Sequence, residues 1–413
     1  MRRIVVTGVG PVTSIGIGRD AFFDGLIKGK NGVGKLTRFD ATDYPVQIAA
    51  EINDFNPFQY GMDKKQIRLL DLYSQYCMAG TFLALEDAGV KPGENVDSDR
   101  IMIRIGTGVG GIGTILEQYE KLLINGPGKR LHPHTVPMIM SNAGSANPDI
   151  VYGITGQNNV VGAACESGAD AETDIYDKIL LGRCDLAITG GAEAGINPFT
   201  IKGFSGAGFG EGALSKTGSR PFDADRDGFV MGEGAGILIL EELQHALDRN
   251  APNIYAEFIG YGHASDAHSI VAPHPEAAGL IKAIENTFKD FGVDKGRVSY
   301  INAHGTSTPL NDKAETKAFK AVFGERAYDI PISSTKSMIG HGFGAAAGIE
   351  TIATVLSIKY GFIHPTINYK TKDPECDLDY TPNEMRECDI DVALKTSSGF
   401  GGHNAALLFA KYN

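Results

Sequence analysis

The sequence predicts an α/β protein made of two similar halves. Short apolar runs typical of strands alternate with helical stretches along the whole chain, and the alternation starts again near residue 256. The length of 413 residues exceeds the size at which one hydrophobic core usually stops growing. Hydrophobic residues make up 42% of the chain, which is ample for a large core. We therefore expect one half in residues 1–255 and another in residues 256–413.

The first half contains short apolar runs that we interpret as strands. These runs lie at residues 4–6, 101–103, 160–161, 186–188 and 237–240. The clearest helix is expected over residues 66–88, where apolar residues from Ile67 to Tyr76 recur every three or four positions and Gly89 provides a stop.

The second half repeats the same alternation. We expect strands at 256–261, 300–302 and 331–333, and helices at 277–291, 312–323 and 344–358. Apolar strands separated by helices are typical of sheets that are buried on both faces.

Composition limits the classes of function. A net charge of −12 disfavours a nucleic-acid surface, and no apolar stretch reaches the roughly 20 residues of a membrane span. Five cysteines form no CxxC pair and the N-terminus is not signal-like, so we expect reduced thiols and a cytoplasmic enzyme. We predict no metal site.

Cys165 is the candidate nucleophile. It follows the apolar run 160–161 and a small-residue turn, and it precedes a helix-like stretch. Free backbone N–H groups and the positive end of a helix dipole stabilise a thiolate and a developing oxyanion at such a place. The alternative is a small buried hydrophobic side chain, a common role for free cysteine.

Two histidines strengthen the nucleophile hypothesis. His304 and His341 each follow a strand-like run and are flanked by small residues that leave a side chain accessible. The other eight histidines have no such setting. Cys165, His304 and His341 together are stronger evidence for a catalytic site than any one of them alone.

At these residues the chain resembles the β-ketoacyl-acyl carrier protein synthases, the decarboxylating condensing enzymes of fatty-acid and type II polyketide assembly. The resemblance runs nearly end to end through ordered motifs, at residues 5–10, 106–111, 220–236, 302–308, 336–341 and 399–404. It implies a thiolase-like fold, a five-layer αβαβα sandwich of two similar halves with the active site where they meet. The first half would carry the cysteine nucleophile and the second half both histidines.

The resemblance also implies roles for the candidate residues. Cys165 would accept the acyl group, while its backbone amide and that of Phe400 would bind the oxyanion. His304 and His341 would donate hydrogen bonds from Nε2 to the enolate formed when malonyl loses CO₂. Two further matches, Lys336 and Glu350, would form a supporting pair near the second histidine, although a partly solvated ion pair without effect on catalysis is the alternative.

Substrate contacts follow from the same resemblance. Thr306 and Thr308 resemble the hydroxyls that hold a phosphopantetheine arm, although threonines in such loops often only form turns. Val109 would lie at the far end of the acyl pocket together with a partner subunit. The Phe400 ring would gate the acyl channel, and the neighbouring Gly401 would permit close approach. No cofactor is expected, because the arm arrives on the carrier protein.

An acidic enzyme that binds an acidic carrier protein needs a local basic patch. Lys64, Lys65 and Arg68 offer one, although a solvated helix face is the alternative. A homodimer and a heterodimer with a chain-length factor both remain open. Glu166 stands where relatives usually have a small or hydroxylated residue, and it either raises the pKa of the neighbouring thiol or points across a subunit interface.

The sequence therefore predicts condensation of an enzyme-bound acyl group with malonyl-carrier protein, in fatty-acid elongation or type II polyketide assembly. The first alternative is a ketosynthase α subunit that works with a chain-length factor. A non-enzymatic chain-length-factor-like subunit is disfavoured by Cys165, and a thiolase by the absence of a second cysteine at Gly399–Gly401. The Gly106-x-Gly108-x-x-Gly111 turn alone is weak evidence for a dinucleotide-binding oxidoreductase.

Overall fold

The computed structural model describes residues 2–206 and 213–413, and within them each half contributes five main strands. The first set is β1 (Ile4–Thr13), β5 (Ile101–Gly106), β6 (Asn158–Val161), β7 (Leu186–Glu193) and β8 (Gly234–Glu242). The second set is β9 (Ala256–Ser265), β10 (Val298–Asn302), β11 (Ile332–Ser333), β14 (Val392–Gly399) and β15 (His403–Ala410).

The two sets have the same strand order and the same directions. The first runs β6-β5-β7-β8-β1 and the second β11-β10-β14-β15-β9. In each, the first two pairings are parallel and the last two antiparallel. Antiparallel pairing of β1 with β9 joins the sets edge to edge, with Val5 opposite Glu257. The predicted division at residues 255 and 256 falls at the start of β9.

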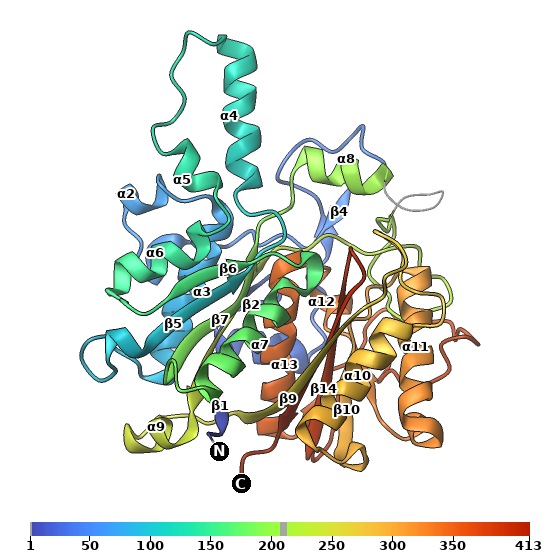
Figure 1. Cartoon of the computed structure of the whole chain (residues 1–413). Helices are drawn as coiled ribbons and strands as arrows, with labels where there is room; N and C mark the ends of the chain where they lie inside the picture. Colours follow the sequence, from blue (N-terminus) through green and yellow to red (C-terminus); the bar gives the residue numbers. More distant parts are fainter. Residues whose placement is uncertain (1, 207–212) are drawn as a thin grey trace.

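We call the two five-stranded sets the first and the second sheet. Helices cover the outer face of each sheet and also lie between the two sheets (Figure 1). α3 (Leu72–Ala88) packs on the first sheet, and α10 (Ala278–Phe291) on the second, with α11 (Pro309–Phe323) beside it. α7 (Ser167–Leu180) and α13 (Ala346–Tyr360) contact each other in the middle layer. The chain therefore has the thiolase-like αβαβα sandwich of two similar halves.

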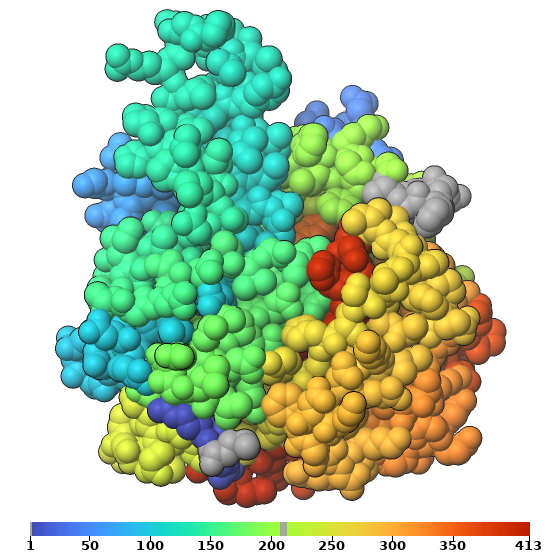
Figure 2. All heavy atoms as spheres, viewed as in Figure 1, coloured from blue at the N-terminus to red at the C-terminus, as the bar shows by residue number. Residues whose placement is uncertain are grey.

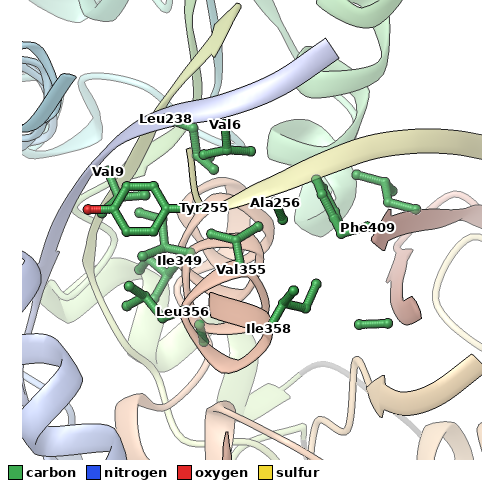
Figure 3. Close-up of a cluster of buried hydrophobic side chains, with 14 of the residues drawn as sticks. Val6, Val9, Leu238, Tyr255, Ala256, Ile349, Val355, Leu356, Ile358 and Phe409 are labelled. Carbon is green, nitrogen blue, oxygen red and sulfur yellow. The ribbon is translucent and has the colours of Figure 1, made fainter. Parts of the chain in front are cut away.

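The middle helix α13 explains how the layers hold together. It is buried from Ala346 to Ile358, so this stretch has no face exposed to solvent, as expected of a helix surrounded by protein. Figure 3 shows Ile349, Val355 and Leu356 of this helix packed in one cluster with Val6 and Leu238 of the first sheet. Glu350 is the charged residue on this buried stretch.

The expected single helix over residues 66–88 is wrong, because two helices occupy this region. α2 (Lys64–Ile67) is a short separate helix, and α3 begins after Asp71. The Asp71 carboxylate accepts hydrogen bonds from the backbone N–H of Tyr73 (3.1 Å) and from the backbone N–H and hydroxyl of Thr114 (2.7 Å each). This N-cap fixes a new helix start that hydrophobic spacing alone does not reveal. The expected stop at Gly89, at φ 64°, is confirmed.

The remaining elements are short or lie at the periphery. The helices are α1 (Arg19–Ile27), α4 (Ile112–Asn125), α5 (Thr135–Ile139), α6 (Ala143–Tyr152), α8 (Pro198–Gly206), α9 (Leu243–Asp248) and α12 (Lys336–Ile339). The strands are β2 (Gly16–Ile17), β3 (Gly34–Lys35), β4 (Ile48–Ala49), β12 (Phe362–Ile363) and β13 (Arg386–Glu387). Figure 2 shows α4 and α5 standing out from the body of the molecule. Within residues 2–206 and 213–413, no helix has the length and apolar character needed to span a bilayer.

Candidate active site

The internal repeat places Cys165 and His341 at comparable points of the two halves, with His304 on the neighbouring loop. Cys165 lies between β6 and α7, and His341 lies between β11 and α13, so each stands between the corresponding strand and the middle-layer helix of its half. His304 follows β10, the strand beside β11. Contact between α7 and α13 then brings the two halves of the site together.

Cys165 sits in a strained turn. It belongs to the 3₁₀ turn Ala164–Glu166, and Ala164 adopts φ 50°, which is costly for a residue with a side chain. Gly399 approaches this turn so closely that an added Cβ would lie 3.0 Å from the Ala163 carbonyl oxygen and 3.3 Å from the Cys165 nitrogen. A side chain at this position would therefore press on the backbone of the nucleophile turn, which favours glycine at the end of β14.

The Cys165 thiol is buried, and this burial raises its pKa to about 12. The charge of Lys336 and a hydrogen bond from the backbone N–H of Phe400 act in the opposite direction. The expectation of a stabilised thiolate considered the helix terminus and omitted desolvation, which dominates in this structure. The thiol form is thus favoured before substrate arrives.

Lys336 orients His304. Its Nζ lies 3.1 Å from His304 Nδ1 and donates to the His304 carbonyl oxygen at 2.8 Å. An ammonium group has only donors, so Nδ1 accepts and the ring proton lies on Nε2. The backbone N–H of His304 donates to Glu315 at 2.8 Å, which fixes the loop after β10.

His341 faces His304 with the ring centroids 5.3 Å apart and the ring planes nearly perpendicular, at 86°. It stacks on Phe343 at 5.2 Å, and its Nδ1 has no hydrogen-bond partner in the described part of the chain. Burial, then the Lys336 charge, lowers the pKa of both histidines well below the usual range. Both rings are neutral at neutral pH.

Glu350 binds the Lys336 ammonium group, as expected, and both side chains are buried. The expected neighbour was the second histidine, His341, but Lys336 contacts His304. A second lysine, Lys395 on β14, lies with Nζ 3.6 Å from the other Glu350 oxygen and donates to Ser397 Oγ at 2.6 Å. Burial lowers the pKa of Lys395. The sequence analysis missed this residue, although a lysine directly after the apolar run Val392–Leu394 was a signal.

Phe400 stands at the turn between β14 and β15, with its backbone N–H directed to Cys165. Its ring is 37% exposed and lies 6.3 Å from the Phe204 ring, centroid to centroid. Gly401 has φ 95°, in the region that only glycine adopts without strain. The turn thus combines an exposed ring with an inward-pointing amide.

The expected substrate-binding residues have mixed settings. The hydroxyls of Thr306 and Thr308 lie 2.8 Å apart, and Thr308 also caps α11. Val109 is 45% exposed, and its backbone N–H donates to the buried Glu193 at 3.3 Å. Glu193 also accepts from the backbone N–H groups of Gly108 (2.6 Å) and Gly344 (3.1 Å), one from each half. The sequence analysis did not predict that Glu193 links the two halves through these hydrogen bonds.

Lys64, Lys65 and Arg68 are exposed and do not join the buried site. They lie on and beside the short separate helix α2 and not on the long helix α3. With Phe58, which is 54% exposed, they line a surface hollow of about 670 Å³.

Comparison with known proteins agrees with this geometry. Models of the β-ketoacyl synthase N-terminal and C-terminal domains match residues 1–246 and 255–370. The chain belongs to the β-ketoacyl synthase family. It is therefore a condensing acyltransferase. It is 45% identical to a 3-oxoacyl-[acyl-carrier-protein] synthase 2 of Synechocystis sp., over 100% of this chain and 98% of that protein.

Two solved structures resemble this β-ketoacyl synthase over 100% of both chains. One is the ishigamide ketosynthase/chain length factor, with a TM-score of 0.94 and 35% identity. The other is a type II PKS acyl-carrier protein in complex with its ketosynthase bound to the hexaketide, with a TM-score of 0.90 and 32% identity.

Proposed function

We propose that this enzyme condenses an acyl group held on Cys165 with malonyl-acyl carrier protein, releasing CO₂ and giving β-ketoacyl-acyl carrier protein. One observation carries the proposal: Lys336 fixes the proton of neutral His304 on Nε2, beside a second neutral imidazole, His341. Two neutral imidazoles can donate hydrogen bonds to an enolate oxygen. Neither is an acid strong enough to protonate the enolate before it attacks the acyl group.

The first step is acyl transfer. The Cys165 sulfur attacks the carrier thioester, the new S–C bond forms, and the carrier C–S bond breaks. The thiol proton ends on the departing carrier sulfur. Backbone N–H groups of Cys165 and Phe400 bind the transient oxyanion, a contribution typically of about 3–4 kcal/mol per donor. The raised pKa of the thiol makes this proton transfer part of the step.

The second step creates the carbon nucleophile. The bond between the malonyl carboxylate and its α-carbon breaks, CO₂ leaves, and the electron pair becomes an enolate. His304 and His341 donate from Nε2 to the enolate oxygen. The enolate carbon then attacks the acyl carbonyl, and the Cys165 S–C bond breaks. The sulfur leaves as a thiolate and regains a proton before the next cycle.

The carrier protein brings the substrate. We assign Thr306 and Thr308 to the phosphopantetheine arm, Val109 to the far end of the acyl pocket, and Gly401 to the turn that lets the amide of Phe400 approach. The exposed Lys64, Lys65 and Arg68 are the docking surface for an acidic carrier. No cofactor enters these steps. We place the enzyme in the cytoplasm, without a nucleic-acid or membrane partner.

A second candidate function is that of the ketosynthase α subunit in a heterodimer with a chain-length factor. The similarity to a ketosynthase/chain length factor structure over both whole chains favours it. The arm formed by α4, where Ile115, Tyr119, Leu123 and Ile124 are between 40% and 74% exposed, offers an apolar face for a partner subunit of either kind. A homodimer would cover the same apolar face. The presence of Cys165 opposes a purely structural role.

Reconstitution separates these functions. The purified enzyme, alone and with proteins that copurify from its host, is incubated with malonyl-loaded carrier and an acyl primer, and carrier-bound products are identified by mass spectrometry. A single extension supports fatty-acid elongation, and an unreduced poly-β-ketone supports the polyketide subunit. No condensation product with any primer would overturn the proposed function.

A further inference from the structure

The ring of His341 is held in a different way from the ring of His304. Nδ1 of His304 lies 3.1 Å from Lys336 Nζ, which fixes that ring by a polar contact. Nδ1 of His341 is buried and has no hydrogen-bond partner in the part of the chain that the structure describes. The orientation of the His341 ring therefore depends on the side chains that pack against it.

Phe343 makes the stacking contact with His341. The two ring centroids are 5.2 Å apart and the ring planes differ by 28°, while Phe229 meets the imidazole edge-on at 5.4 Å. Phe343 adopts φ 48°, a backbone conformation that is costly for a bulky residue. Such a conformation persists only when neighbouring groups hold it in place.

The neighbouring group that holds Phe343 is Glu193, the last residue of β7. The backbone N–H of Gly344, the residue after Phe343, donates to Glu193 Oε2 at 3.1 Å. Gly344 also lies against the backbone of the first half, because an added Cβ would be 2.6 Å from the Gly108 nitrogen and 2.6 Å from Thr107 Cα. Glu193 therefore fixes the strained turn at the point where the two halves touch.

Four donors surround the Glu193 carboxylate, two at each oxygen. Besides Gly344, Oε2 accepts from the backbone N–H of Gly108 at 2.6 Å. Oε1 accepts from the hydroxyl of Thr107 at 3.0 Å and from the backbone N–H of Val109 at 3.3 Å. Burial raises the pKa of Glu193 to about 7, and these hydrogen bonds oppose the rise. A proton on the carboxyl group would displace one of the donors, so the geometry favours the ionised form.

We propose that Glu193 is a positioning residue for His341. Its carboxylate holds Gly344, the hydrogen bond to Gly344 stabilises the strained backbone of Phe343, and the Phe343 ring sets the plane of the His341 imidazole. The inference rests on the proposed function, in which His341 donates a hydrogen bond to the enolate. Glu193 then acts on decarboxylation without touching the substrate.

Acyl transfer should depend much less on Glu193. Burial raises the pKa of the Cys165 thiol, and the charge of Glu193 raises it further. Glu166, the neighbour of Cys165 in the chain, instead lies with Oε1 2.9 Å from His263 Nδ1. Loss of the Glu193 charge would favour the Cys165 thiolate, so a variant without this charge should keep its acyl transfer while decarboxylation slows.

Glu193→Gln tests the proposal. The amide has a single oxygen acceptor, and its NH₂ group would face donors on one side. We expect CO₂ release from malonyl-carrier protein to fall about tenfold or more, as for other groups that orient a functional histidine, and acyl-enzyme formation to change less than about threefold. If Glu193→Gln does not fold, Glu193→Asp, which keeps the charge but has a shorter reach towards Gly344, is measured in its place with the same expectation.

Glu241→Gln is the matched control. Glu241 is also a buried carboxylate, and it lies at the opposite end of the paired strands β7 and β8, bound to Arg249 and His245. Its replacement should lower stability without changing the ratio of the two half-reaction rates. An equal loss of both half-reactions in Glu193→Gln would reduce Glu193 to a structural role and overturn the proposal.

Phe343→Leu tests the route from Glu193 to His341. It removes the stacked ring, so it should slow decarboxylation and spare acyl transfer as Glu193→Gln does. Residues that act through the same group have non-additive effects. The combination of Glu193→Gln with Phe343→Leu should therefore be little slower than the slower single variant, and multiplied losses would overturn this route.

NMR of labelled histidine gives a readout that does not depend on activity. The ring protons of His341 experience the ring current of Phe343, so their shifts should move in Glu193→Gln while those of His304 stay in place. Phe343→Leu identifies the His341 signals. Unchanged His341 shifts in folded Glu193→Gln would overturn the proposal. Absence of CO₂ release from the unsubstituted enzyme would instead overturn the proposed function, and the shifts would still decide whether Glu193 positions His341.

Discussion

The Nζ atom of Lys336 lies 3.1 Å from Nδ1 of His304, and this contact decides which nitrogen of the ring carries a proton. Lys336 is held in turn by Glu350, to which Lys395 adds a second cation. Neither lysine needs to touch substrate for this effect. Lys336 acts on decarboxylation by presenting the Nε2–H of His304 to the enolate.

Replacement of Lys336 should separate the half-reactions. In Lys336→Met the ring of His304 loses its fixed tautomer, and we expect malonyl-carrier decarboxylation to fall by about 10–100-fold, as for other groups that orient a functional histidine. Acyl transfer to Cys165 should change less. Release of CO₂ and acyl-enzyme formation are measured separately, with Lys282→Met, at an exposed position of α10, as a surface control. Equal losses in both half-reactions would contradict this division.

Removal of the nucleophile should leave the imidazoles functional. Cys165→Ala cannot form the acyl-enzyme, so condensation should fall at least 1,000-fold, on the order of the loss of a catalytic nucleophile. His304 and His341 remain, so CO₂ should still be released from malonyl-carrier protein, with acetyl-carrier as the product. Mass spectrometry of the carrier distinguishes the two outcomes. A variant that releases no CO₂ while folded would show that Cys165 also takes part in decarboxylation.

The alkylation rate of Cys165 should rise with pH over an unusually wide range. Burial raises the pKa of this thiol to about 12, so the thiolate fraction should grow roughly tenfold per pH unit well beyond the usual value of about 8.5. The neutral thiol is the form favoured by folding, and this contribution to stability is lost as the pH rises towards the folded-state pKa. Iodoacetamide labelling of Cys165, followed by peptide mass spectrometry, gives the profile. A plateau below pH 8 would contradict it.

A side chain at Gly399 should disturb the turn that carries Cys165. In Gly399→Ala the new Cβ would meet the Ala163 carbonyl oxygen at 3.0 Å and the Cys165 nitrogen at 3.3 Å. We expect a stability loss of about 1–3 kcal/mol from overpacking and at least a tenfold loss of condensation. Gly203→Ala is the matched control, because no atom of residues 2–206 and 213–413 would lie within 4 Å of an added Cβ at Gly203. Thermal unfolding and steady-state kinetics report the two effects, and normal kinetics in Gly399→Ala would refute the close-approach argument.

Eight of the ten main strands, all but β14 and β15, and the helices α10, α11 and α13 could be predicted from the sequence, because buried strands and flanking turns leave local patterns. Cys165, His304 and His341 were found because each follows a strand-like run among small residues. The helix break before Asp71 could not be found, since it depends on Thr114, 43 residues away. Glu193 was missed for the same reason. Its ligands are backbone N–H groups from both halves, and no residue pattern encodes their convergence.

Lys395 should affect the pH at which the rate of decarboxylation falls on the acid side. Its charge lowers the pKa of His304, after burial and the effects of Lys336 and His341. In Lys395→Met that contribution disappears, so the pKa of His304 rises and the ring becomes protonated at a higher pH. Once His304 is an imidazolium, the site no longer has two neutral imidazoles. The fall in decarboxylation rate on the acid side should therefore occur at a higher pH. Lys395→Arg, which keeps the charge, should restore the profile if the effect is electrostatic. An unchanged acid limb in Lys395→Met, with Glu350 still bound to Lys336, would assign Lys395 to stability alone.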